Sequence, residues 1–260
     1  MKLTILGSGT STGVPQLRCA CPVCRSTDPL DNRLRCSALL ETGDRHILID
    51  CGPDFRQQML RYHREGLLDA LLLTHQHYDH VGGIDDLRPY CYRDGSPAEF
   101  PVYCTETVAA ALRESMPYSF AAERYPGVPT FDIHSVTPYE PFIAAGIDVL
   151  PVPAMHSAEY NLQVTGFRFG PLAYLTDVKT IAPEAVEALR GVEVLVINAL
   201  RIREHRSHLS LAEALEVVGR IQPRRAYLTH ICHGMGLHSE VSRTLPEGVF
   251  LAYDGLEITL

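Results

Sequence analysis

The stretch His75-Gln76-His77-Tyr78-Asp79-His80 contains four residues of metal-binding type within six positions. It follows the apolar run 70–73 and precedes Gly82-Gly83, so we expect it at the end of a buried strand. In an extended segment the first two histidines point to the same side, while the carboxylate and the third histidine reach a neighbouring point. Imidazole and carboxylate together suit zinc, manganese or iron. The run therefore predicts ligands for two adjacent divalent metal ions.

A related pattern occurs three times, because an apolar strand ending in Leu-Thr is followed at once by a residue that can bind metal. Leu73-Thr74-His75, Leu175-Thr176-Asp177 and Leu228-Thr229-His230 share this arrangement. Functional side chains are commonly held on the rim of a rigid sheet. We therefore expect three strand ends to deliver ligands to one site.

Composition and charge restrict the functional classes. The chain has 260 residues, of which 46% are hydrophobic, and a formal net charge of -8. These values are ordinary for a globular protein, and the negative charge disfavours a long nucleic acid as partner. We expect no export signal, and no segment reaches the roughly 18 apolar residues of a membrane helix. A cytoplasmic protein with one domain over residues 1–260 is predicted, and a homodimer is compatible with the sequence.

Strand-like and helix-like segments alternate, which predicts an α/β (α+β) protein with sheets covered by helices. The clearest helix start is Ser210-Leu211-Ala212-Glu213, which has the form of a capping box. The segments 90–101 and 118–141 are expected to be loops that set specificity. The predicted strands are 2–6, 37–41, 46–50, 70–73, 147–152, 162–169, 172–175, 192–197, 226–228 and 256–260, and the predicted helices are 53–63, 105–115 and 183–190.

The HxHxDH run resembles the signature of the metallo-β-lactamase superfamily, and the resemblance extends from Leu3 to Leu260. It implies an αββα sandwich with two metal ions at one edge, between the sheets. It also implies that Asp177 bridges the two ions and that Asp50 supports the ligands from beside them by hydrogen bonding. The ligands that the resemblance implies are His75, His77 and His156 for the first metal, Asp79, His80 and His230 for the second, and Asp177 for both.

Within this superfamily the chain is similar to the PhnP-type cyclic-phosphate phosphodiesterases. One shared feature is the glycine-rich turn at 6–15, whose backbone N–H groups could hold a phosphate or simply form a tight turn. A second is Cys19-x-Cys21-x-x-Cys24 with His233, which resembles a closed structural zinc site, the alternative being unpaired surface thiols. A third is His208, which resembles a catalytic histidine outside the metal ligands; a plain loop histidine, or a role for His205 instead, are the alternatives.

The resemblance implies a metal-dependent phosphodiesterase that acts on a small cyclic or nucleotide-like phosphodiester. Two Zn²⁺ or Mn²⁺ ions would activate a bound hydroxide, and His208 as an imidazolium would protonate the leaving alkoxide. Three alternatives stay open. A tRNA 3′-end endonuclease would carry a long basic arm, which the sequence does not show. Ester, thioester, lactam or lactone hydrolysis would use the same metals, whereas a non-catalytic nucleotide or metal sensor would be expected to lack a ligand.

Overall fold

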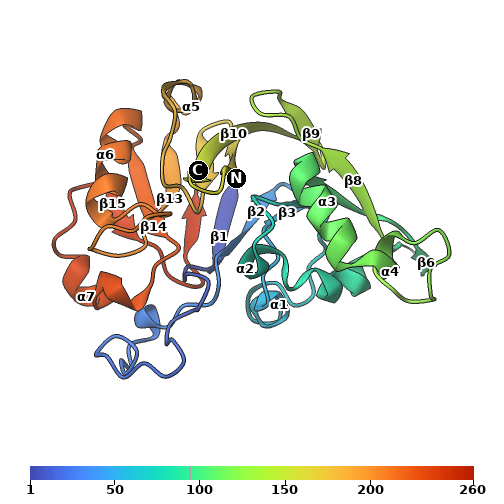
Figure 1. Cartoon of the computed structure of the whole chain (residues 1–260), viewed down its shortest axis with the longest axis horizontal. Helices are drawn as coiled ribbons and strands as arrows, with labels where there is room; N and C mark the ends of the chain where they lie inside the picture. The colour runs from blue at the N-terminus through green and yellow to red at the C-terminus, as the bar shows by residue number, and fades with distance from the viewer. Residues whose placement is uncertain (94) are drawn as a thin grey trace.

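The computed structural model describes residues 1–93 and 95–260, and two seven-stranded sheets form its centre (Figure 1). The first sheet has the strand order β16-β1-β2-β3-β4-β7-β8, and the second has the order β15-β14-β13-β12-β11-β10-β9. A short pair, β5 (Tyr92–Arg93) and β6 (Ser96–Pro97), lies outside both sheets. Each sheet is mixed, because antiparallel pairs at one side continue into parallel pairs at the other.

The first sheet is built from β1 (Lys2–Gly7), β2 (Ser37–Thr42), β3 (Arg45–Ile49), β4 (Ala70–Leu72), β7 (Phe100–Cys104), β8 (Phe131–Ser135) and β16 (Glu257–Thr259). The second is built from β9 (Phe142–Ala144), β10 (Ile147–Ser157), β11 (Leu162–Phe169), β12 (Leu172–Leu175), β13 (Val194–Asn198), β14 (Arg225–Thr229) and β15 (Val249–Leu251). The helices are α1 (Phe55–Tyr62), α2 (Tyr78–Val81), α3 (Glu106–Ser115), α4 (Pro117–Phe120), α5 (Pro183–Ala188), α6 (Leu211–Ile221) and α7 (His238–Val241), with 3-10 turns at Pro29–Asp31, Ile84–Tyr90 and His233–Met235.

Three apolar layers hold these elements together. Between the sheets, residues such as Leu3, Phe167 and Tyr174 are buried against each other. A second layer packs α1 and α3 on the first sheet, and a third packs α5 and α6 on the second sheet. Strands covered on both faces are mainly apolar, as in β13, where every residue is buried and only Asn198 at the end is polar. The predicted αββα sandwich is therefore confirmed.

The predicted elements correspond to observed ones, but the sequence reading missed several strands. All ten predicted strands and all three predicted helices are present; strands 162–169 and 172–175 have the predicted ends, and each of the others differs at one end or both. The segment 118–141, expected to be a loop, contains β8, and 90–101 contains β5, β6 and the start of β7, with Asp94 outside the described residues. β7 contains Pro101 and β8 alternates polar with apolar residues, so neither shows the apolar run of an inner strand.

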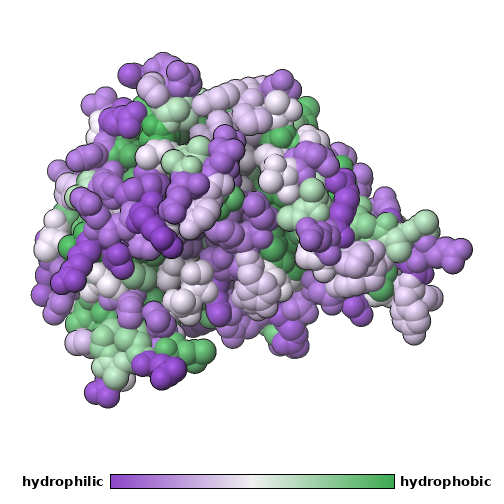
Figure 2. Space-filling view, in the orientation of Figure 1, coloured by the Kyte–Doolittle hydropathy of each residue, from purple (hydrophilic) through white to green (hydrophobic). Residues whose placement is uncertain are grey.

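The segment between β1 and β2 protrudes from the sandwich at the lower left of Figure 1. Apart from the 3-10 turn Pro29–Asp31 it has no helix or named strand. In Figure 2 the same projection shows apolar surface among polar residues, and Leu17 within it is 88% exposed. Among the described residues, no helix combines the length and the apolar character that crossing a membrane requires.

Candidate dinuclear metal site

The HxHxDH run forms the connection from β4 into α2. It packs on the segment that follows β3, where the amide of Cys51 donates to the carbonyl oxygen of His80 at 2.8 Å. A Cβ atom at Gly52 would collide with the carbonyl oxygen of Asp79, so only glycine allows this approach. The ligand run is thus fixed against the end of a central strand.

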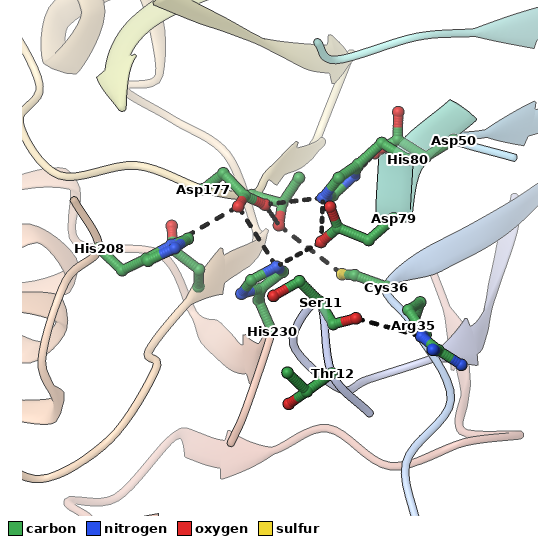
Figure 3. A network of polar contacts seen from close by, with 12 residues as sticks. Ser11, Thr12, Arg35, Cys36, Asp50, Asp79, His80, Asp177, His208 and His230 are labelled. Atoms are coloured by element: carbon green, nitrogen blue, oxygen red, sulfur yellow. Dashed lines mark hydrogen bonds and ion pairs between the residues drawn. The ribbon is translucent and has the colours of Figure 1, made fainter. Parts of the chain in front are cut away.

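The structure brings all seven predicted ligands together as two adjacent groups. Ligand-type atoms lie within 4.8 Å of one another in each group. The ring centroids of His75 and His80, one from each group, are 4.3 Å apart. Figure 3 shows His80, His208 and His230 directed toward Asp177. The first group contains His75, His77 and His156, and the second contains Asp79, His80, Asp177 and His230.

Both sheets contribute to this cluster through residues at strand ends. His75 follows β4 of the first sheet, while Asp177 and His230 follow β12 and β14 of the second. Asp50, Asp177 and His230 have left-handed backbone conformations, with φ values of 60°, 60° and 54°. Such residues cost of the order of 1 kcal/mol or more and are concentrated at functional sites. The Leu-Thr pattern correctly indicated where these ends lie.

A chain of hydrogen bonds sets the tautomers of two imidazoles. The Thr74 hydroxyl donates to Asp50 at 2.9 Å, so toward the Nδ1–H of His75, 3.0 Å away, it can only accept. The Nδ1–H of His80 donates to the same carboxylate at 2.6 Å. Both Nε2 atoms therefore face the cluster, where they are buried without a hydrogen-bonding partner among the described residues. Asp50 lies where the sequence predicted a supporting acid.

The second group has the charge pattern of a cation site. Nε2 of His80 lies 3.2 Å from a carboxylate oxygen of Asp79 and 3.2 Å from one of Asp177. Burial alone would lower the pKa of His80, but Asp177 and Asp50 outweigh it and raise that pKa well above its ordinary value. The carboxylates thus favour a positive charge at this point. A divalent cation would satisfy both them and the inward Nε2 atoms, so the residues fit a metal pair.

His156 links the metal ligands to the loop before α6. Its Nδ1–H donates to the carbonyl oxygen of Ser207 at 2.7 Å, which leaves Nε2 available to a metal. Ser207 precedes His208, whose Nδ1 lies 3.5 Å from a carboxylate oxygen of Asp177. The rival residue, His205, instead accepts a hydrogen bond from the amide of Ser207. The geometry therefore favours His208 over His205 as the histidine beside the cluster.

The surroundings of His208 disfavour a proton on its imidazole. Its side chain is only 12% exposed, and burial lowers its pKa to about 3. Asp177 raises this pKa, but His230 and His156 lower it further. Burial and the neighbouring histidines therefore favour the neutral imidazole, and a negative charge placed against His208 would favour the protonated form that can donate.

The predicted structural zinc residues meet away from this cluster, on the protruding segment. Nδ1 of His233 lies 3.0, 3.5 and 3.4 Å from the sulfur atoms of Cys19, Cys21 and Cys24. All eight cysteines are free thiols. A Cys₃His set matches closed tetrahedral zinc and would tie the projection to the 3-10 turn His233–Met235.

Backbone amides of the glycine-rich turn donate hydrogen bonds to other segments of the chain. The amide of Ser8 donates to Asp254 at 2.8 Å, and the amide of Thr10 donates to the carbonyl oxygen of Ile231 at 3.1 Å. Its exposed tip, Ser11 and Thr12, lies beside the ligand cluster in Figure 3. Most of the turn is therefore unavailable to a phosphate.

Sequence reasoning missed two groups that support the ligands. One is the hydroxyl of Thr74, which the Leu-Thr pattern contained, and the other is the carbonyl group of Ser207, for which the sequence has no signal.

Comparisons with known proteins agree on the family to which such a site belongs. The family described as the beta-lactamase superfamily domain matches residues 45–231. A curated protein named octanoyltransferase, from Porphyromonas gingivalis, is 44% identical over 259 residues, which are 99% of this chain and 51% of that protein. The chain spans about half the length of the curated relatives it matches, so their names describe considerably longer proteins.

Two solved structures extend the likeness over the whole chain. A structure described as a new diphosphatase from the PhnP family is 38% identical, with a TM-score of 0.90 and coverage of 99% of this chain and 96% of that chain. Zinc-bound PqqB from Methylobacterium extorquens is 22% identical, with a TM-score of 0.79 and full coverage of both chains. At that identity the second likeness concerns the fold alone.

Proposed function

The chain belongs to the metallo-β-lactamase superfamily, and from this premise we propose that it hydrolyses a phosphorus–oxygen bond in a small phosphodiester or diphosphate. The observation that carries the proposal is the position of His208. This imidazole lies outside the two groups that contain the seven predicted ligands, although it also forms a metal-binding group with His156 and Asp177, and it lies 3.5 Å from Asp177 on a loop anchored to His156. A leaving alkoxide or phosphate needs such a proton source, whereas metal binding alone does not.

Two divalent ions would be held by the two ligand groups, with Asp177 between them. Zinc or manganese, when bound, would supply a nucleophile at neutral pH and neutralise the charge of a phosphate. Asp50 and Thr74 would keep the imidazoles in the correct tautomers. These residues account for hydrolysis in general and do not by themselves select phosphorus over carbon.

The loop before α6 supplies the selectivity for an anion. Within six residues it carries Arg201, Arg203 and Arg206 against one glutamate. Arg201 donates to the carbonyl oxygens of Arg203 and Glu204 at 3.2 and 2.8 Å and so braces the loop. Arg203 and Arg206 are exposed. Guanidinium groups suit phosphate oxygens, so this loop supports a substrate with one or two phosphate groups.

A bound phosphate would also change His208. Its low pKa has burial as the largest cause, and a nearby anion acts in the opposite direction. Substrate binding would thus favour the protonated form of His208. The name of the PhnP-family diphosphatase supports the same substrate class.

The test compares bond types on the protein loaded with zinc or with manganese. Bis(p-nitrophenyl) phosphate, a cyclic ribosyl phosphate, a nucleoside diphosphate, a lactam and a tRNA with a 3′ extension would be offered in parallel. We expect the highest kcat/KM on a small phosphate substrate, with loss of activity in Asp177→Ala. A preference for the lactam or the tRNA, or inactivity on all phosphates with both metals, would overturn the proposal.

Ester or thioester hydrolysis is a second candidate because of one relative. The 44% identical protein carries the name octanoyltransferase, although this chain matches only 51% of its length. An octanoyl thioester therefore belongs in the same assay. Faster turnover of this thioester than of every phosphate would favour the second candidate.

A further inference from the structure

Another cluster of metal-binding side chains lies outside both sites described above. It consists of Glu41 on β2, His46 on β3 and His63 directly after α1. Glu41 and His46 are partners in the β2–β3 ladder, and one ligand-type atom from each of the three residues lies within 4.8 Å of the others. The hydrolytic site lies beyond the other end of β3, where Asp50 follows the strand. We propose that this cluster is a mononuclear site for Zn²⁺ or a similar transition-metal ion.

The hydrogen bonds leave one lone pair on each side chain for such an ion. Nε2 of His63 lies 3.1 Å from the carbonyl oxygen of Leu67, which only accepts, so the proton is on Nε2 and the lone pair on Nδ1. Oε2 of Glu41 forms an ion pair with Nζ of Lys2 at 2.8 Å. Oε1 of the same carboxylate faces His46 and carries the remaining lone pairs.

The spacing also suits a cation better than a hydrogen bond. Nε2 of His46 and Oε1 of Glu41 are 3.9 Å apart, which is too long for a hydrogen bond. Two ligands of a tetrahedral zinc ion with bonds of ~2.0–2.1 Å lie roughly 3.3–3.4 Å apart, so a small closure of the two side chains would bring both onto one ion. The rings of His46 and His63 are close, with centroids 4.7 Å apart, and they are tilted by 48°. One ion between the three side chains would satisfy all of them and leave a position for water.

A carboxylate stands behind His46, as behind many metal-binding histidines. Oδ2 of Asp69 lies 3.9 Å from Nδ1 of His46, and this nitrogen is buried with no hydrogen-bonding partner among the described residues. The carboxylate is held by the amide of His46 at 2.9 Å and by Arg45 at 3.3 Å. A small closure would let Nδ1–H donate to Asp69 and direct Nε2 toward the ion.

Lys2 gives the proposal a sharp test, because its charge opposes a cation at Glu41. Removing it with Lys2→Gln should tighten metal binding at this site. If the cluster is instead an ordinary surface ion pair, the same substitution changes no metal affinity. A bound ion would join the β2–β3 hairpin to the end of α1, so it should also raise the melting temperature.

The experiment titrates Zn²⁺ into the holoprotein, whose hydrolytic and Cys₃His sites are already filled, and measures heat and metal per chain. We expect one additional ion per chain, abolished in His63→Ala and His63→Gln and retained in the control His134→Ala, a partly exposed histidine on β8. Asp69→Asn should weaken it by about 10–100-fold. Phosphodiester hydrolysis should be unchanged in the His63 variants, which verifies folding. Absence of the additional ion, its survival in His63→Gln, or no tightening in Lys2→Gln would overturn the proposal.

Discussion

The Nδ1 atom of His80 lies 2.6 Å from Oδ2 of Asp50, and both side chains are fully buried. The same carboxylate accepts hydrogen bonds from the amide and the hydroxyl of Thr74, whose oxygen in turn accepts from His75. One carboxylate thus orients a ligand in each of the two metal groups. Burial has the largest effect on the pKa of Asp50 and raises it above the ordinary value of an aspartate. The hydrogen bonds from His80 and Thr74 act in the opposite direction.

Asp50→Asn should weaken metal binding at both positions of the pair. The amide keeps the size of the side chain but cannot accept at both of its ends, so either His80 or Thr74 loses its partner. We expect the affinity for zinc or manganese to fall by about 10–100-fold. Competition with a chelator, followed by metal analysis, measures the change.

Asp254→Asn is the matched control, because Asp254 is a partly buried carboxylate whose pKa burial likewise raises. It accepts from the amides of Ser8 and Leu34 at 2.8 and 2.7 Å and takes no part in the ligand groups. This variant should lose stability and keep its active-site metal affinity. If both variants lose metal equally, the effect belongs to general destabilisation and the role given to Asp50 is wrong.

Zinc binding at the Cys₃His site should strengthen as the pH rises. Burial raises the pKa of Cys24 to about 11, while the amide of Cys24 donates to Cys21 and lowers that thiol's pKa to about 7. Zinc takes thiolates, so near neutral pH zinc binding must release the Cys24 proton, and acid opposes binding.

Zinc affinity measured by chelator competition from about pH 6 to about pH 8 tests this sign. Cys24→Ser should bind zinc more weakly, while Cys232→Ser, outside the site, should behave like wild type. A pH-independent affinity, or no loss of thermal stability when zinc is removed, would count against a structural zinc site.

The sequence was most informative where chemistry is local. The Ser210 hydroxyl accepts from the amide of Glu213 at 3.4 Å, and Glu213 accepts from the amide of Ser210 at 2.8 Å, so the predicted capping box is present. The strand ends that carry His75, Asp177 and His230 were also indicated, because an apolar run followed by Thr and a ligand is visible in a few residues.

Contacts between segments that are distant in the sequence could not be predicted from such short patterns. Ser207 is 51 residues from His156, and nothing near either residue indicates their hydrogen bond. The low pKa of His208 likewise arises from burial by other segments, so the expected imidazolium could not be judged from its neighbours in sequence. β8 was missed because its pairing with β7 across an intervening segment, rather than its composition, makes it a strand.

Arg203→Ala combined with Arg206→Ala should weaken substrate binding more than it slows turnover. The two exposed guanidinium groups lie on the loop beside the site and would contact phosphate oxygens that do not react, which chiefly raises KM. We expect an increase of about tenfold on a diphosphate, since charge-assisted contacts are worth about 1.5–3 kcal/mol and exposed ones less.

Steady-state kinetics on the charged substrate and on bis(p-nitrophenyl) phosphate measure the effect, which should be smaller on the second, less charged compound. Arg190→Ala provides the control, since Arg190 pairs with Glu187 at the surface after α5. A large fall in kcat with KM unchanged would assign the arginines to the reaction itself and not to substrate binding.

His208→Ala should separate proton donation from metal binding. His208 forms a metal-binding group with His156 and Asp177, but the seven residues of the two ligand groups that would hold the metal pair all remain without it, so we expect the variant to keep both metals and its fold. On an ester with a poor alkoxide leaving group, kcat should fall by about 10²–10⁴-fold, the usual contribution of a general acid. Metal analysis and single-turnover kinetics on the same preparation measure both quantities.

The leaving group decides between the roles of His208. p-Nitrophenolate needs no proton, so His208→Ala should recover much of its activity on that substrate, whereas Asp177→Ala, which damages the metal pair, should stay inactive on both. His205→Ala is the control, because His205 is held by Ser207 and should affect neither substrate strongly. Equal losses in His208→Ala on both substrates would mean that His208 binds phosphate or orders its loop. If His208→Ala lost almost no activity while His205→Ala lost much of its activity on the ester with the poor leaving group, the proton donor would be His205.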